Sequence, residues 1–156
     1  MKSISFFHVM SKRDQKPINA YLQKQFGVSL DRQFVYVLSN KSNLYMATPM
    51  LNALPLEHMR ITTIGLYLGE WSHGELRLSI EGSQLFGPHA TQNVFDLTND
   101  ELSLWMRGER LAKDAECVGY VIVRHNVDYL GCGRLKNGAL LNFIPKTRRL
   151  QETISE

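Results

Sequence analysis

Between residues 129 and 151 the chain has several basic side chains and no acidic one. The basic residues of this segment are Arg134, Lys136, Lys146, Arg148 and Arg149. Arginine and lysine neutralise phosphates, and an acid-free basic run on a folded scaffold is how a protein presents a phosphate-binding face. The same run is equally well explained as a solvated strand edge that its charge keeps soluble. The segment alone therefore leaves both interpretations open.

Sequence patterns typical of catalysis are absent. The chain has no His-Glu-x-x-His pattern, and its five histidines lie far apart: His8, His58, His73, His89 and His125. Gly131 and Gly133 resemble the start of a dinucleotide-binding loop, but Lys136 stands where the third glycine would be. We therefore expect no cofactor, no metal and no enzymatic activity. A small-molecule enzyme with a cleft between two domains stays an alternative.

The composition is that of a soluble globular protein. The 156 residues are 44% hydrophobic and 21% charged, with a net charge of +3. No apolar stretch approaches the ~20 residues that cross a bilayer, so no membrane association is expected. The two cysteines, Cys117 and Cys132, fit no common zinc or redox spacing, and we interpret them as free thiols in a reducing compartment. This indicates a cytoplasmic location.

The N-terminal half alternates between strand and helix patterns. Strands are expected at 3–9, 33–39, 44–47, 61–68 and 76–80. Apolar residues recur at helical spacing over 14–26, which predicts a helix with Pro17 in its first turn and Gly27 as its stop. Short helical segments are expected at 48–54, after Thr48 as the N-cap, and at 83–86.

The C-terminal half is rich in strands, which we expect at 94–97, 119–125, 129–135 and 139–143. Thr98 and Glu101 have the spacing of a capping box, and Trp105 lies on the apolar stripe of the short helix that follows. Asn137-Gly138 predicts a tight hairpin. The whole chain is thus expected to be α+β, with an N-terminal α/β domain at 1–92 packed on a small C-terminal β-barrel at 93–156.

Three stretches of the C-terminal half resemble the PUA domain, an RNA-binding module: LWMRGERL at 104–111, GYVIV at 119–123 and YLGCG at 129–133. The ending, KNG at 136–138, NFIPK at 142–146 and Arg149, looks like the PUA-like domain of Sun/Fmu-type RNA cytosine-5 methyltransferases. Upstream, GELRLSI at 74–80 and LFGPHA at 85–90 are similar to small ribosome-biogenesis proteins that pair an α/β domain with a PUA domain.

This resemblance implies an RNA-binding protein that acts on structured rRNA or tRNA as an accessory to ribosome biogenesis or RNA modification. The RNA-binding residues that it implies are Arg107, Gly108, Arg110, Arg134, Lys136, Asn137, Lys146, Arg148 and Arg149. Gly108 is equally well explained as a helix C-terminal glycine. The N-terminal domain is expected to dock a protein or to add RNA contacts through Lys12, Arg13 and Lys16.

Two partner classes follow besides RNA, namely an RNA methyltransferase and a pre-ribosomal protein. The chain would then be an accessory to one of them. An alternative from another class is an interaction adaptor that supplies a PUA domain in trans to a methyltransferase that lacks its own.

Overall fold

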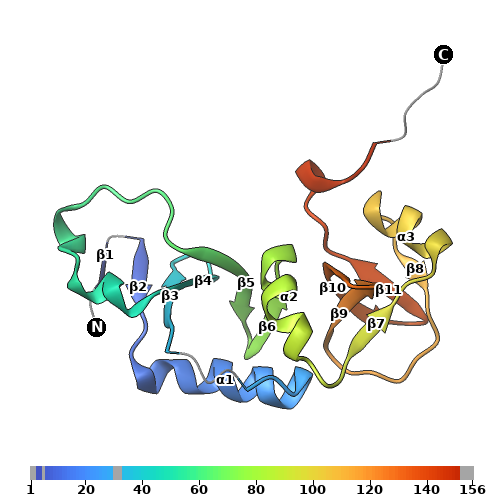
Figure 1. Cartoon of the computed structure of the whole chain (residues 1–156), viewed down its shortest axis with the longest axis horizontal. Coiled ribbons are helices and arrows are strands. Elements are labelled where there is room, and N and C mark those ends of the chain that lie inside the picture. The colour runs from blue at the N-terminus through green and yellow to red at the C-terminus, as the bar shows by residue number, and fades with distance from the viewer. Residues whose placement is uncertain (1–2, 5, 30–32, 152–156) are drawn as a thin grey trace.

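A computed structural model describes residues 3–4, 6–29 and 33–151 of the chain (Figure 1). Two sheets lie side by side along the long axis of the molecule. The first is an antiparallel meander of six strands that pair in chain order. Its strands are β1 (Ser3–Ile4), β2 (Phe7–Val9), β3 (Val35–Ser39), β4 (Asn43–Ala47), β5 (Leu66–Ser72) and β6 (Glu75–Leu78). The expected strand at 3–9 is therefore a pair of short strands, and Ser5 between them lies outside the described residues.

Helix α1 (Lys12–Phe26) covers one face of this sheet. It begins two residues earlier than the sequence predicted, because Ser11 and Asp14 form a capping box. Pro17 consequently lies inside the helix and not in its first turn, which corrects the prediction. Gly27 ends the helix in the left-handed conformation, as expected, with a φ of 68°.

The segment between β4 and β5 packs against the opposite face of the first sheet. It contains the 3-10 helices Pro49–Ala53 and Leu56–His58, of which the first is the short helix expected after Thr48 as the N-cap. The predicted strand at 61–68 is wrong in its first half, since β5 begins only at Leu66. Ile61 and Ile64 are apolar because they pack on Phe7 and its buried neighbours, not because they pair in the sheet.

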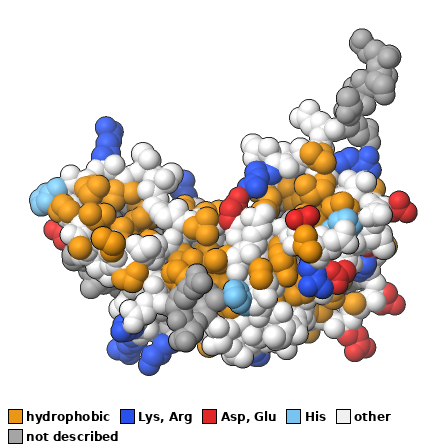
Figure 2. Space-filling view, in the orientation of Figure 1, with side chains coloured by type: hydrophobic (Ala, Val, Ile, Leu, Met, Phe, Trp, Pro, Cys, Tyr) orange, Lys and Arg blue, Asp and Glu red, His pale blue; other side chains and the backbone are white. Residues whose placement is uncertain are grey.

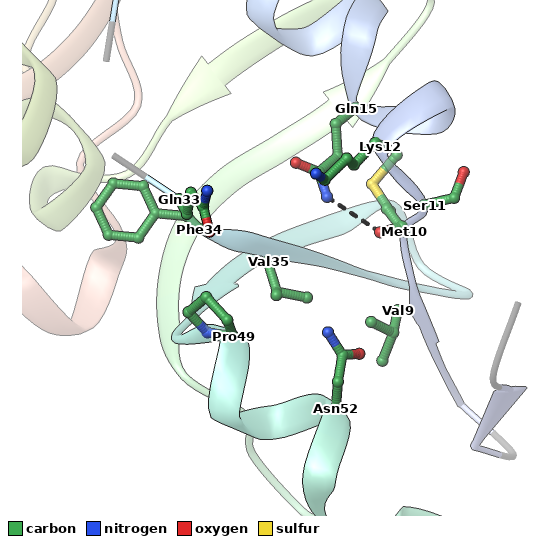
Figure 3. Close-up of a pocket in the computed structure, with 10 residues that line it drawn as sticks. All are labelled: Val9, Met10, Ser11, Lys12, Gln15, Gln33, Phe34, Val35, Pro49 and Asn52. Atoms are coloured by element: carbon green, nitrogen blue, oxygen red, sulfur yellow. Dashed lines mark hydrogen bonds between the residues drawn. The ribbon is translucent and has the colours of Figure 1, made fainter. Parts of the chain in front are cut away.

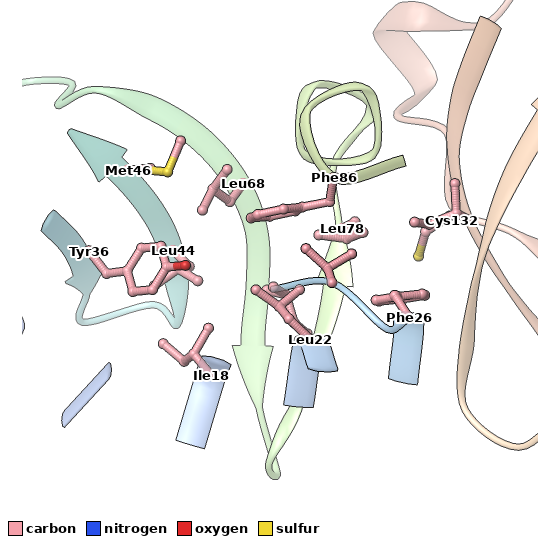
Figure 4. Packing of buried hydrophobic residues seen from close by; sticks show 13 residues of the cluster. Ile18, Leu22, Phe26, Tyr36, Leu44, Met46, Leu68, Leu78, Phe86 and Cys132 are labelled. Atoms are coloured by element: carbon pink, nitrogen blue, oxygen red, sulfur yellow. The ribbon is translucent and has the colours of Figure 1, made fainter. Parts of the chain in front are cut away.

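Helix α2 (Ile80–Phe86) joins the two sheets, and the 3-10 helix Gly87–His89 follows it. It fits closely against β5, because a Cβ atom on Gly82 would lie 2.2 Å from the backbone oxygen of Leu68. On its other side the buried Ser83 hydroxyl accepts a 2.9 Å hydrogen bond from the Gly131 backbone N–H. One hydrophobic cluster accordingly runs from the first sheet through α1 and α2 to Cys132 of the second (Figure 4).

The second sheet has the strand order β7-β9-β10-β11-β8, with β7 parallel to β9 and the other pairs antiparallel. Its elements are β7 (Val94–Asp96), α3 (Asn99–Met106), β8 (Leu111–Ala112), β9 (Tyr120–His125), β10 (Asp128–Lys136), β11 (Ala139–Asn142) and the 3-10 helix Lys146–Arg148. A bulge between Tyr129 and Cys132 bends β10, with Gly131 at a φ of 109°. Trp105 of α3 is fully buried against this sheet.

Two sheets with helices confirm the α+β class. The second sheet curls into half a barrel, since no pairing between β7 and β8 occurs in the described part of the chain. The domain boundary at residue 92 stays a prediction. None of the helices among the described residues is long and apolar enough to cross a membrane.

Candidate nucleic-acid interface

Capping residues define both ends of helix α3. At its start Thr98 and Glu101 form the predicted capping box. At its end Arg107 is the C-cap, and Gly108 follows in the left-handed region with a φ of 86°. The helix therefore stops at a defined position next to the end of the described chain.

The tail, which we define as residues 143–150, runs along this helix end. The Leu150 N–H donates to the Met106 carbonyl at 2.8 Å. The Arg149 Nε donates to the Ile144 carbonyl at 3.0 Å, which folds its side chain back over the tail. A Cβ atom on Gly108 would lie 2.2 Å from that Nε, so glycine makes room for the arginine. The second interpretation of Gly108, a helix-terminal glycine, fits this geometry.

Asn142 also links the end of α3 to the start of the tail. Its Nδ2 donates to the carbonyls of Trp105 at 2.8 Å and Glu109 at 3.0 Å, while its Oδ1 accepts from the Ile144 N–H at 2.8 Å. The sequence marked Asn142 only as part of a distinctive NFIPK ending and gave it no role. Its position directly after a strand and before Pro145 was the available signal for a side chain that caps a turn.

Five basic residues gather on the tail and the end of α3, and we call them the tail patch: Arg107, Arg110, Lys146, Arg148 and Arg149. Two of them pair with glutamates, Arg107 with Glu109 at 3.3 Å and Arg148 with Glu81 of α2. Burial alone would raise the pKa of Glu81, but the hydrogen bond from Arg148, a backbone hydrogen bond and the Arg148 charge together outweigh it, and the pKa is lowered. That carboxylate therefore stays charged at neutral pH.

Arg110 and Lys146 differ from the other cations of the tail patch. Both are exposed, and neither makes an ion pair with any residue that the structure describes. Their charges are thus available to a polyanion in solvent at no cost in broken internal pairs.

Arg134 lies outside the tail patch, between the two sheets. Its Nη1 donates to Glu75 of β6 at 2.9 Å, and its guanidinium lies 4.8 Å from the centre of the Tyr120 ring. The hydrogen bond to Glu75 raises the pKa of Arg134 further above its ordinary value. Arg134 is half-buried, and its Nη1 is already hydrogen-bonded within the protein.

Lys136 and Asn137 are at the tip of the β10–β11 hairpin, where the predicted Asn-Gly turn is confirmed with φ values of 51° and 73° at Asn137 and Gly138. Gly133 pairs with Asn142, whereas Lys136 pairs with Ala139. At about 3.3 Å per residue, three residues put the tip roughly 10 Å further along the strands than the start of the tail. The structure therefore divides the predicted site residues among the tail patch, the hairpin tip and the position of Arg134.

Hollows occur in both halves of the molecule. A pocket of about 490 Å³ lies on the first sheet beside the start of α1, with Lys12 and Asn52 on its wall (Figure 3). The space-filling view also shows the molecule hollowed between the parts that contain the two sheets (Figure 2). No cluster of His, Cys, Asp or Glu that could hold a metal occurs among the described residues. Both cysteines are free, and burial raises the pKa of Cys132 to about 12.

Residues 92–150, which contain the half-barrel, the capped helix and the basic tail, match a family model of a PUA domain. The model is that of the PUA domain of methyltransferase RsmF. The C-terminal region therefore resembles the PUA-like domains of Sun/Fmu-type methyltransferases, as the sequence indicated. A search of curated proteins gave no match. The likeness of the whole layout to ribosome-biogenesis proteins stays a prediction.

Proposed function

We propose that this protein binds structured RNA, either rRNA or tRNA, through the tail patch, and that it serves RNA modification or ribosome biogenesis by binding and not by catalysis. The observation that carries the proposal is the match to an RsmF-type PUA domain over the residues that form the patch. A PUA domain suggests RNA binding in general. The kind of RNA and the process that it serves are part of the proposal.

Arg110 and Lys146 are the side chains on which the proposal depends most. An exposed cation without an internal partner gains a phosphate contact and releases a counterion from the RNA. Arg148 and Arg107 would have to share their charge with Glu81 and Glu109. We therefore expect them to contribute less to affinity than Arg110 and Lys146.

We propose that the N-terminal α/β domain, at 1–92 in the predicted division, supports the PUA domain. Glu75 and Glu81 reach from this half to Arg134 and Arg148 of the other. An RNA methyltransferase or a pre-ribosomal protein is the protein partner that we propose. The cytoplasmic location belongs to the same proposal and is supported by the two free cysteines.

The test is a filter-binding titration of the full chain against unfractionated tRNA over a series of salt concentrations. We expect log K to fall linearly with log salt, with a slope of about 0.7–0.9 for each phosphate neutralised. A DNA duplex is the comparison for RNA preference, because PUA-type recognition is expected to favour RNA. Binding that is undetectable at low salt, or insensitive to salt, would overturn the proposal.

A further inference from the structure

A second pocket, of about 280 Å³, opens where the two sheets meet, and we call it the seam pocket. Its wall includes Tyr67 of β5 and Arg77 of β6 on one side, and Phe143 and Pro145 of the tail on the other. Cys132, fully buried, is also part of the lining. Both halves of the chain are needed to form this pocket.

The walls of the seam pocket present planar groups that are already held in place. The Phe143 ring packs edge-on against Tyr120 at 5.8 Å, and the Arg77 guanidinium lies 5.1 Å from its centre. The Tyr67 ring lies 5.5 Å from that of Tyr45 and keeps 37% of its surface exposed. Aromatic rings and guanidinium planes are the groups on which unstacked bases of single-stranded RNA stack.

The charge of the seam pocket favours a neutral guest over a phosphate. Arg77 is paired with Glu70 at 2.7 Å, so its positive charge is compensated within the protein. The Cys132 thiol is protonated at neutral pH and behaves as an apolar side chain, because burial raises its pKa. The volume lies just under the ~300–1,000 Å³ of pockets for drug-sized ligands, which suits a group as small as one base.

The tail joins the seam pocket directly to the tail patch. Pro145 lines the pocket, and the next residue along the chain is the exposed Lys146. A nucleotide whose phosphate contacts Lys146 therefore has its base close to the mouth of the pocket. The walls alone would accept any flat molecule. The basic patch at the edge of the pocket is what favours a nucleotide.

We propose that the seam pocket receives one unstacked base of the bound RNA, stacked on the exposed Tyr67 ring beside the Phe143–Arg77 pair, while the adjoining phosphate lies on the tail patch. This inference rests on the proposed RNA binding and adds to it that recognition includes a base and both halves of the chain. Sequence preference would then arise at one single-stranded position, whereas the phosphate contacts are independent of sequence.

The test is an abasic scan of an RNA hairpin with an unpaired loop. Each loop nucleotide in turn loses its base and keeps its phosphate, and the affinity of the full chain is measured. We expect one position at which base removal weakens binding roughly 5- to 150-fold, as for the loss of one stacked base. The salt dependence should not change, because no phosphate is removed.

Protein variants complete the test. With Tyr67→Ala the penalty for the missing base should largely disappear, Tyr67→Phe should restore it, and Arg77→Met should reduce it. Phe6→Ala removes a ring that is 60% exposed in the first sheet region and should leave the full penalty. The proposal that the seam pocket receives a base would be overturned by either of two results. One is hairpin binding that no base removal weakens, and the other is a loss of affinity on base removal that is equal in wild type and Tyr67→Ala. Absence of any RNA binding would instead overturn the proposed function.

Discussion

Replacing Arg110 and Lys146 together by alanine is expected to reduce the slope of log K against log salt by about two. Both side chains are exposed and have no ion-pair partner among the described residues, so each can neutralise one phosphate. If the plots of log K against log salt for the wild type and the double variant meet near 1 M salt, the affinity of the variant at 0.1 M salt is lower by about two powers of ten. Filter binding to unfractionated tRNA measures both quantities.

A matched control is the pair Lys41→Ala and Arg60→Ala. These residues are one lysine and one arginine, both exposed and both in the first half of the chain, so the control removes the same net charge away from the PUA domain. A loss as large as that of Arg110→Ala and Lys146→Ala would show that general charge, and not the tail patch, determines binding. That result would contradict the site.

Trp105→Ala is expected to lower the free energy of unfolding by about 3–5 kcal/mol. The indole is fully buried, and its Nε1 donates to the Leu130 carbonyl at 3.4 Å. It lies so close to β10 that a Cβ on Gly133 would be 3.0 Å from the ring. Alanine would leave a large cavity between α3 and the second sheet. Urea unfolding followed by circular dichroism measures the loss.

Val127→Ala is the control for this measurement. Val127 is 83% exposed in the turn between β9 and β10, and its truncation should change the stability by about 0.5 kcal/mol or less. If Trp105→Ala lowers the free energy of unfolding no more than Val127→Ala does, the expectation is wrong, because α3 would then not depend on the indole for its position. If Trp105→Ala is stable and its slope of log K against log salt is unchanged, the position of the tail does not depend on the packing of α3.

Local signals in the sequence were sufficient for the parts of the fold that depend on a few neighbouring residues. The Thr98 capping box, the stop at Gly27 and the Asn137-Gly138 turn are confirmed because each is decided by its own backbone conformation. The Ser11–Asp14 capping box has the same spacing and was missed, which misplaced the start of α1. Its side-chain pattern was recognisable in the sequence.

Other features depend on tertiary contacts and could not be read locally. Apolar residues at 61–64 predicted a strand, but they pack on the face of a sheet without joining it. Strand β8 has only two residues, too few for any periodicity. Its pairing with β11 is decided by the rest of the second sheet.

The candidate site likewise has features that the sequence indicates locally and features that depend on tertiary contacts. The sequence identified the basic residues, and their exposure at Arg110 and Lys146 agrees with a binding surface. It could not show that Arg134 pairs with a glutamate 59 positions earlier, or Arg148 with one 67 positions earlier. Those distant glutamates decide which cations are available to RNA. The seam pocket likewise combines β5 and β6 with the tail, which no spacing in the sequence indicates.

The most direct test of the central claim, that the PUA domain binds RNA at the tail patch, is ultraviolet crosslinking of the full chain to unfractionated tRNA, followed by mass spectrometry of the crosslinked peptides. The account predicts nucleotide adducts on peptides that contain residues 107–110 and 143–149. Adducts confined to the first sheet and α1, with none on these two segments, would contradict it.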